Sequence, residues 1–247
     1  MIPATRRVLI ALVVVGTAAG WLLLRELPWP ARSYTVFLLV PLPAVLLAQA
    51  RLIRDLPEDA EREGIYVSSA VSVWVLAAFA MVAARFSGMT RSDLRLEPPD
   101  PALLLGATAA TILAGLAVLA AGRILRLRES ALLDYLIPRT SSEKIAFAGL
   151  SVSAGIAEEL VFRSFLIAAV ISAGASLGAA VAVSVAAFAV SHAYQGMSGV
   201  IRVGILGLVL TAPYVVTGSV YPSILAHILL DLLAGLVLAD WLRGHRD

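Results

Sequence analysis

Long apolar runs, each about as long as a membrane is thick, constrain this chain more than any other feature. A transmembrane helix needs roughly 20 mostly apolar residues, and Pro101–Gly122 contains no charged residue at all. Seven further segments have a similar character: Val8–Leu24, Tyr34–Ala50, Ile65–Ala84, Ile145–Ile171, Leu177–Ala193, Val200–Thr217 and Tyr221–Trp241. The runs predict an all-α fold, a polytopic membrane helix bundle with seven or eight transmembrane segments.

The composition excludes the other classes of protein. Of the 247 residues, 60% are hydrophobic and 15% are charged, whereas a soluble domain of this size must present many polar residues to water. The absence of cysteine excludes thiol catalysis and thiolate metal ligands. The net charge is +2, and no basic stripe with interleaved aromatic residues is present, so nucleic acid is not an expected partner.

Three segments need interpretation. Val8–Leu24 resembles a signal peptide, but its apolar run continues past the small residues at 17–19, which favours an uncleaved helix. Pro41 and Pro43 predict a kink in the second segment. Pro213 interrupts Val200–Thr217, so we expect this segment to be broken or tilted, and it need not cross fully.

The chain divides into three parts. Residues 1–122 form a membrane scaffold of four helices, and residues 123–144 are a basic connector, either an amphipathic interfacial helix or a solvated loop. Residues 145–247 form a C-terminal membrane region. Thr140 and Glu143 have the spacing of a capping box, which predicts that a helix begins here.

The distribution of basic residues predicts the orientation. If the N-terminus is inside, the inner loops carry 12 Arg and Lys and the outer loops carry 5, counted from the sequence. The positive-inside rule therefore predicts a cytoplasmic N-terminus. The almost exclusive use of arginine as the basic residue suggests a bacterial plasma membrane.

Ionisable residues are confined to the last four apolar segments, where each acid or arginine costs roughly 2.5–3.5 kcal/mol on insertion scales. Such residues persist when they pair, line a wet cavity or perform chemistry. The second half of the chain therefore carries the site, and its candidates are Glu158, Glu159, Arg163, His192, Arg202, His227 and Asp231.

The two glutamates must have different roles, because neighbouring residues on a helix point about 100° apart. Glu159 and Arg163 are four residues apart, the spacing of an ion pair on one face. Glu158 is then the unpaired carboxylate and the candidate general base.

The histidines add two further motifs. His192 follows Phe188 by four residues, and His227 precedes Asp231 by four, so that Asp231 has the spacing to orient the His227 ring. If all eight segments cross, these two histidines lie near opposite ends of their helices, and a broken seventh segment would bring them together.

These motifs together, EExxxR (158–163), FxxxH (188–192) and HxxxD (227–231), resemble the CPBP family, also called Abi or CAAX-protease-like, which includes the Rce1-type prenyl proteases. The resemblance implies an intramembrane endopeptidase that acts on a protein or peptide substrate. It further implies that Glu158 and His192 activate a water, that Glu159 and Arg163 hold the helix, and that His227 and residue 231 stabilise the oxyanion.

One residue departs from this pattern. Well-studied family members have asparagine at the position of Asp231, and an ionised carboxylate repels an oxyanion where an amide would donate to it. Asp231 must then be protonated, orient His227, or bind a metal. A zinc ion is compatible with the residue types, although no HExxH motif is present.

Two other functions are open. Gly196-Met197-Ser198-Gly199 with His227 resembles a rhomboid serine protease, but this reading leaves the glutamates unexplained. The polar cluster could also serve a non-catalytic membrane protein, such as a transporter or a member that binds a peptide for immunity.

Overall fold

The computed structural model describes residues 4–53, 61–125, 135–239 and 241. Its helices, in chain order, are α1 (Ala4–Leu23), α2 (Trp29–Leu39), α3 (Pro41–Ile53), α4 (Arg62–Phe86), α5 (Pro101–Ile124), α7 (Ser141–Glu158), η1 (Glu159–Leu166), α8 (Ile167–Ser172), α9 (Leu177–Ser191), η2 (Ala193–Gln195), α10 (Gly196–Thr217), α11 (Tyr221–Leu232) and η3 (Leu233–Val237). No strand occurs within these ranges. The all-α prediction is confirmed.

Four helical segments are long and apolar enough to cross a membrane: Trp29–Ala48, Arg62–Phe86, Pro101–Ile124 and Ala193–Thr217. Shorter apolar helices accompany them, including Leu177–Ser191 and Tyr221–Val237. The chain is therefore a membrane helix bundle. The total of seven or eight crossings, the cytoplasmic N-terminus and the division into three parts stay predictions.

Proline has different effects at two positions. α2 ends at Leu39 and α3 begins at Pro41, which confirms the predicted kink, because proline is tolerated in the first turn of a helix but not in its interior. Pro213, in contrast, lies inside the continuous helix α10. Of the two alternatives, a broken or a tilted segment, the break was wrong and the tilt stays a prediction. α10 has the length of a full crossing.

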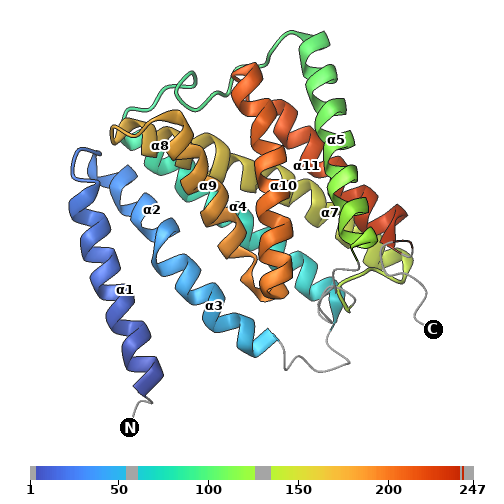
Figure 1. The fold of residues 1–247 in the computed structure, drawn as a ribbon, viewed down its shortest axis with the longest axis horizontal. Helices are drawn as coiled ribbons and strands as arrows, with labels where there is room; N and C mark the ends of the chain where they lie inside the picture. Colours follow the sequence, from blue (N-terminus) through green and yellow to red (C-terminus); the bar gives the residue numbers. More distant parts are fainter. Residues whose placement is uncertain (1–3, 54–60, 126–134, 240, 242–247) are drawn as a thin grey trace.

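The helices pack around one central segment. α7 and η1 lie against α4, α9 and α11, while α5 packs against α10 and α11. α1 lies at one edge of the bundle, beside α2 and α3 (Figure 1). The most deeply buried large side chains include Arg163, Phe165 and Glu159, so the polar residues of η1 are at the centre of the molecule.

The capping box that the sequence predicts begins α7. The Thr140 hydroxyl accepts from the Glu143 amide, and the Glu143 carboxylate accepts in return from the Thr140 amide. The Glu143 carboxylate also accepts from the Arg139 amide. This bond, followed by the one from the Thr140 amide, holds the pKa of Glu143 below its ordinary value.

The predicted connector, residues 123–144, is described only in part, because residues 126–134 lie outside the described residues. Near the end of the connector, the Leu136 carbonyl accepts a hydrogen bond of 2.8 Å from the Tyr66 hydroxyl on α4.

A π-helix was not predicted from the sequence. The helix that begins at Ser141 continues to Ser172, but residues Glu159–Leu166 within it have π geometry. Short π segments widen a helix and occur often at functional sites. Glu158 is the last residue of the α-helical part, so the two glutamates stand at the point where the geometry changes.

α7 and α11 approach each other closely at a glycine. A Cβ built on Gly155 would lie 2.4 Å from Ile228 Cγ1 and 2.9 Å from the Ile228 amide nitrogen. Since only glycine leaves this space, Gly155 allows the helix that carries His227 to reach the helix that carries the glutamates.

Candidate active site

The predicted ion pair between Glu159 and Arg163 is present at the centre of the bundle. Arg163 Nη1 donates to Glu159 Oε1 at 2.9 Å, and both side chains are 0% exposed. A buried pair of this kind is strongly destabilised when one partner is removed, because the other charge is left without compensation.

Arg163 also holds two neighbouring helices. Its Nη2 donates to the Gly207 carbonyl at 3.1 Å and its Nε to Thr211 Oγ1 at 3.3 Å, both on α10. The guanidinium lies 4.3 Å from the ring centre of Phe188 on α9, within the range of a cation–π interaction. The position of Arg163 therefore fixes the positions of α9 and α10 around the site.

His227 is held by Glu159. Its Nδ1 lies 2.8 Å from Glu159 Oε1, the oxygen that also accepts from Arg163. A carboxylate only accepts hydrogen bonds, so Nδ1 carries the proton. The sequence allowed Asp231, four residues away on the same helix, to orient this ring, as one of three alternatives. Glu159, on another helix, forms the bond instead.

The other nitrogen of His227 faces two carboxylates. His227 Nε2 is 3.9 Å from Glu158 Oε2 and 3.7 Å from Asp231 Oδ2. Both distances exceed the length of a direct hydrogen bond and suit contact through one water molecule. Side-chain exposure rises from 0% at Glu159 through 8% at His227 and 17% at Glu158 to 40% at Asp231, so the site opens at Asp231.

His192 caps α9 on the other side of Phe188. Its Nδ1 lies 2.8 Å from the Phe188 carbonyl oxygen, and because a carbonyl only accepts, Nδ1 is the donor. Nε2 of the neutral ring is then an acceptor. The rings of His192 and His227 lie 4.7 Å and 6.2 Å from the Phe188 ring, which brings the two histidines together without a break in α10.

The water that Glu158 and His192 are expected to activate stays a prediction. Within the described part of the chain, the ionisable partner of Glu158 is His227, at 3.9 Å. The structure thus gathers the six predicted site residues in one cluster, to which His192 is linked through the Phe188 ring. Arg202, a seventh ionisable residue of the apolar segments, lies on α10.

The sequence analysis did not identify several residues of the site. Gly207 and Thr211 accept hydrogen bonds from Arg163, but in the sequence they are only a glycine and a threonine in an apolar helix, which does not single them out. The loop before α5 also contributes: Ser164 of η1 donates to the Leu94 carbonyl, and Arg95 Nη1 donates to the Tyr214 carbonyl at 2.7 Å. Arg95 has a positive φ of 51°, which is uncommon outside glycine.

Among the described residues, no group of three or more His, Asp or Glu side chains is arranged to hold a metal ion. The zinc ion that the residue types allow stays a prediction. The serine-protease alternative also lacks support, because the His227 nitrogens face carboxylates while Ser198 is exposed in the first turn of α10.

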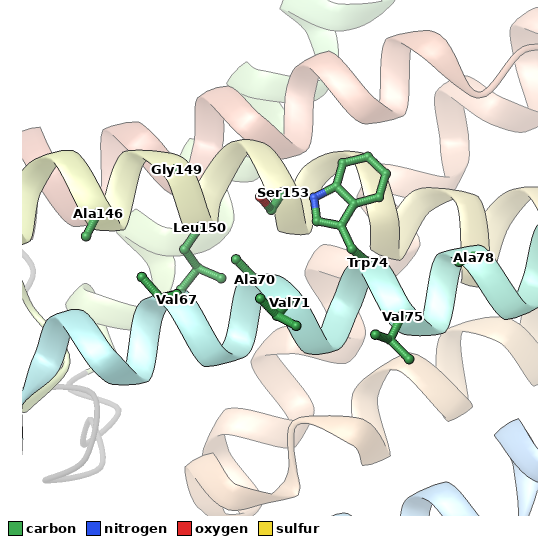
Figure 2. Close-up of a pocket in the computed structure, with 10 residues that line it drawn as sticks. All are labelled: Val67, Ala70, Val71, Trp74, Val75, Ala78, Ala146, Gly149, Leu150 and Ser153. Atoms are coloured by element: carbon green, nitrogen blue, oxygen red, sulfur yellow. The ribbon is translucent and has the colours of Figure 1, made fainter.

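An apolar groove lies away from this cluster, between α4 and α7. It has a volume of about 550 Å³ and contains no ionisable side chain. Trp74 extends from α4 across it towards Ser153 (Figure 2). The groove offers no group for chemistry, so the polar cluster around η1 is the candidate active site.

Comparison with known families agrees with the motifs. Residues 140–233 match the family described as type II CAAX prenyl endopeptidase Rce1-like. The match extends from the capping box of α7 to the end of α11 and includes all six candidate residues. No curated protein and no solved structure matches the chain.

Proposed function

Because residues 140–233 match the Rce1-like family, we propose that this membrane protein is an intramembrane endopeptidase that hydrolyses a peptide bond with an activated water. The observation that carries the proposal is the fixed ring of His227. Glu159 holds Nδ1, so Nε2 faces Glu158 and Asp231 at distances that suit a shared water.

Glu158 is the proposed general base. The water oxygen attacks the scissile carbonyl carbon while the Glu158 carboxylate takes a proton from the water. The neutral His192 ring assists through Nε2, since its Nδ1 is bonded to the Phe188 carbonyl. In the next step the carbon–nitrogen bond breaks, and the proton held by Glu158 passes to the leaving amine.

His227 is the proposed oxyanion donor. In its doubly protonated form it donates Nδ1–H to Glu159 and Nε2–H to the oxygen of the tetrahedral intermediate. A donor that is already oriented stabilises developing charge at no cost of reorganisation. Glu159 is then a positioning residue, and Arg163 in turn holds its carboxylate through the 2.9 Å bond between Nη1 and Oε1.

The substrate is a protein or peptide at the membrane. The proposal places the protein in a bacterial plasma membrane with a cytoplasmic N-terminus.

The test compares the membrane peptides of cells that express the wild type, Glu158→Gln or Glu63→Gln. Glu63 is an exposed glutamate in the first turn of α4 and serves as the matched control. We expect a set of cleavage products with the wild type and Glu63→Gln that is lost with Glu158→Gln, because turnover falls by roughly 10²–10⁴ without the base. Identical peptide profiles in all three strains would refute the protease assignment.

A further inference from the structure

Tyr194 stands beside the candidate active site with a hydroxyl proton to donate. It lies in η2, two residues after His192, and the two rings are 5.9 Å apart. The phenol oxygen accepts a hydrogen bond from Gln195 Nε2 at 3.2 Å. No residue in the described ranges accepts the phenol proton, which leaves this donor for a ligand.

The phenol oxygen is held in place by a packed neighbour. Gln195 is buried, and a Cβ built on Gly199 would lie only 2.3 Å from Gln195 Cβ. Gln195 therefore packs directly against the bare backbone of Gly199 at the start of α10. A side chain fixed in this way holds its hydrogen-bond partner in one position.

The Tyr194 ring belongs to the group of rings that contains both histidines of the site. His192, the neighbour of Tyr194, lies 4.7 Å from the Phe188 ring, and the Phe188 ring lies 6.2 Å from His227. The Tyr194 side chain is half-buried, so part of it is open to a substrate.

The site needs a second donor. An oxyanion hole usually contains two or more oriented donors, and the described cluster offers Nε2 of His227. Residue 231 is an aspartate, which has no hydrogen to donate when it is ionised. A phenol carries a donor that stays protonated at neutral pH.

Building on the proposed endopeptidase function, we propose that Tyr194 is a further catalytic residue whose O–H donates a hydrogen bond to the oxyanion of the tetrahedral intermediate. His227 and Tyr194 then approach this oxygen from two helical segments, and Tyr194 supplies the donor that Asp231 lacks.

The test uses Tyr194→Phe, which removes the hydroxyl alone. Tyr221→Phe on α11 is the control, because the Tyr221 hydroxyl makes no hydrogen bond within the part of the chain that the structure describes. The probe is a quenched fluorescent peptide with the sequence around the bond that the wild type cleaves and Glu158→Gln does not. We expect kcat to fall by about 10²-fold in Tyr194→Phe, the effect of removing one oxyanion donor, with KM within about twofold. The control should keep wild-type kinetics.

A second background separates catalysis from a structural role. In Asp231→Asn the new amide can donate to the oxyanion, so the Tyr194→Phe change should cost less than about tenfold there. An equal loss in both backgrounds would mean that Tyr194 and residue 231 act independently, which contradicts the inference that Tyr194 supplies the donor that Asp231 lacks. A Tyr194→Phe enzyme with wild-type kcat would also overturn the inference. Either result leaves the proposed function intact as long as Glu158→Gln is inactive. If the wild type and Glu158→Gln release the same peptides, both the endopeptidase function and the role of Tyr194 are refuted.

Discussion

Replacement of Glu159 by glutamine should destabilise this protein far more than the same replacement at Glu158. Both side chains of the Glu159–Arg163 pair are 0% exposed. Glutamine can still accept from Arg163 Nη1 and from His227 Nδ1, so the lost quantity is the negative charge rather than the hydrogen bonds. Breaking a buried pair in this way costs about 3–5 kcal/mol.

The structure also predicts a rescue. In Glu159→Gln/Arg163→Met both charges are removed, and a buried pair replaced by neutral residues is often close to neutral in stability. The Gly207 carbonyl, which Arg163 contacts, keeps its bond from Thr211 Oγ1 at 2.7 Å. The double variant should therefore recover most of the stability that the single variant loses, although it loses the cation–π contact with Phe188.

Thermal unfolding in detergent measures these effects. For a chain of this size, a loss of 3–5 kcal/mol lowers Tm by roughly 6–20 °C. Glu158 is 17% exposed and its nearest described ionisable partner is 3.9 Å away, so Glu158→Gln should change Tm by less than about 3 °C. A Glu159→Gln variant as stable as the wild type, or a double variant no more stable than the single one, would show that the buried pair does not hold the bundle together.

Two further predictions concern packing and pH. Gly155→Ala should lose both activity and roughly 1–3 kcal/mol of stability, because its Cβ would push against the Ile228 backbone. Gly149→Ala on the same helix, where a Cβ meets nothing within 4 Å, should retain both, and equal behaviour of the two variants in unfolding and turnover assays would contradict the close approach. The Thr90 backbone amide and hydroxyl hold the pKa of Asp93 below its ordinary value of 3.8. A lowered carboxyl pKa stabilises the folded state above the unfolded pKa and ceases to do so as the pH falls through the folded one. The Tm advantage of wild type over Asp93→Asn should thus be present at neutral pH and shrink in acid, and a constant difference would rule out this carboxylate as its source.

Local spacing allowed several features to be predicted from the sequence. Glu159 and Arg163 face each other because residues four apart share one side of a helix, and the π geometry of η1 did not remove that contact. The capping box at Thr140 depends only on residues within one turn. The apolar runs predicted helices, since a backbone in lipid must satisfy its hydrogen bonds within each segment. Charged residues inside the apolar segments of the second half of the chain indicated where the site lies.

The contacts between helices were decided only by the tertiary structure. From the sequence, Asp231 was a candidate partner for His227, yet the partner is Glu159, 68 residues away in the chain. The bond that Arg163 donates to Thr211 and the approach of Tyr194 to the site could not be predicted from the sequence either. The period of the α-helix determines which residues share one face of a helix. Which face contacts a neighbouring helix depends instead on the rotation of both helices and on how closely they approach. Here that approach depends on a missing side chain at Gly155 and on buried polar bonds around Arg163, and both take effect only when the bundle is packed.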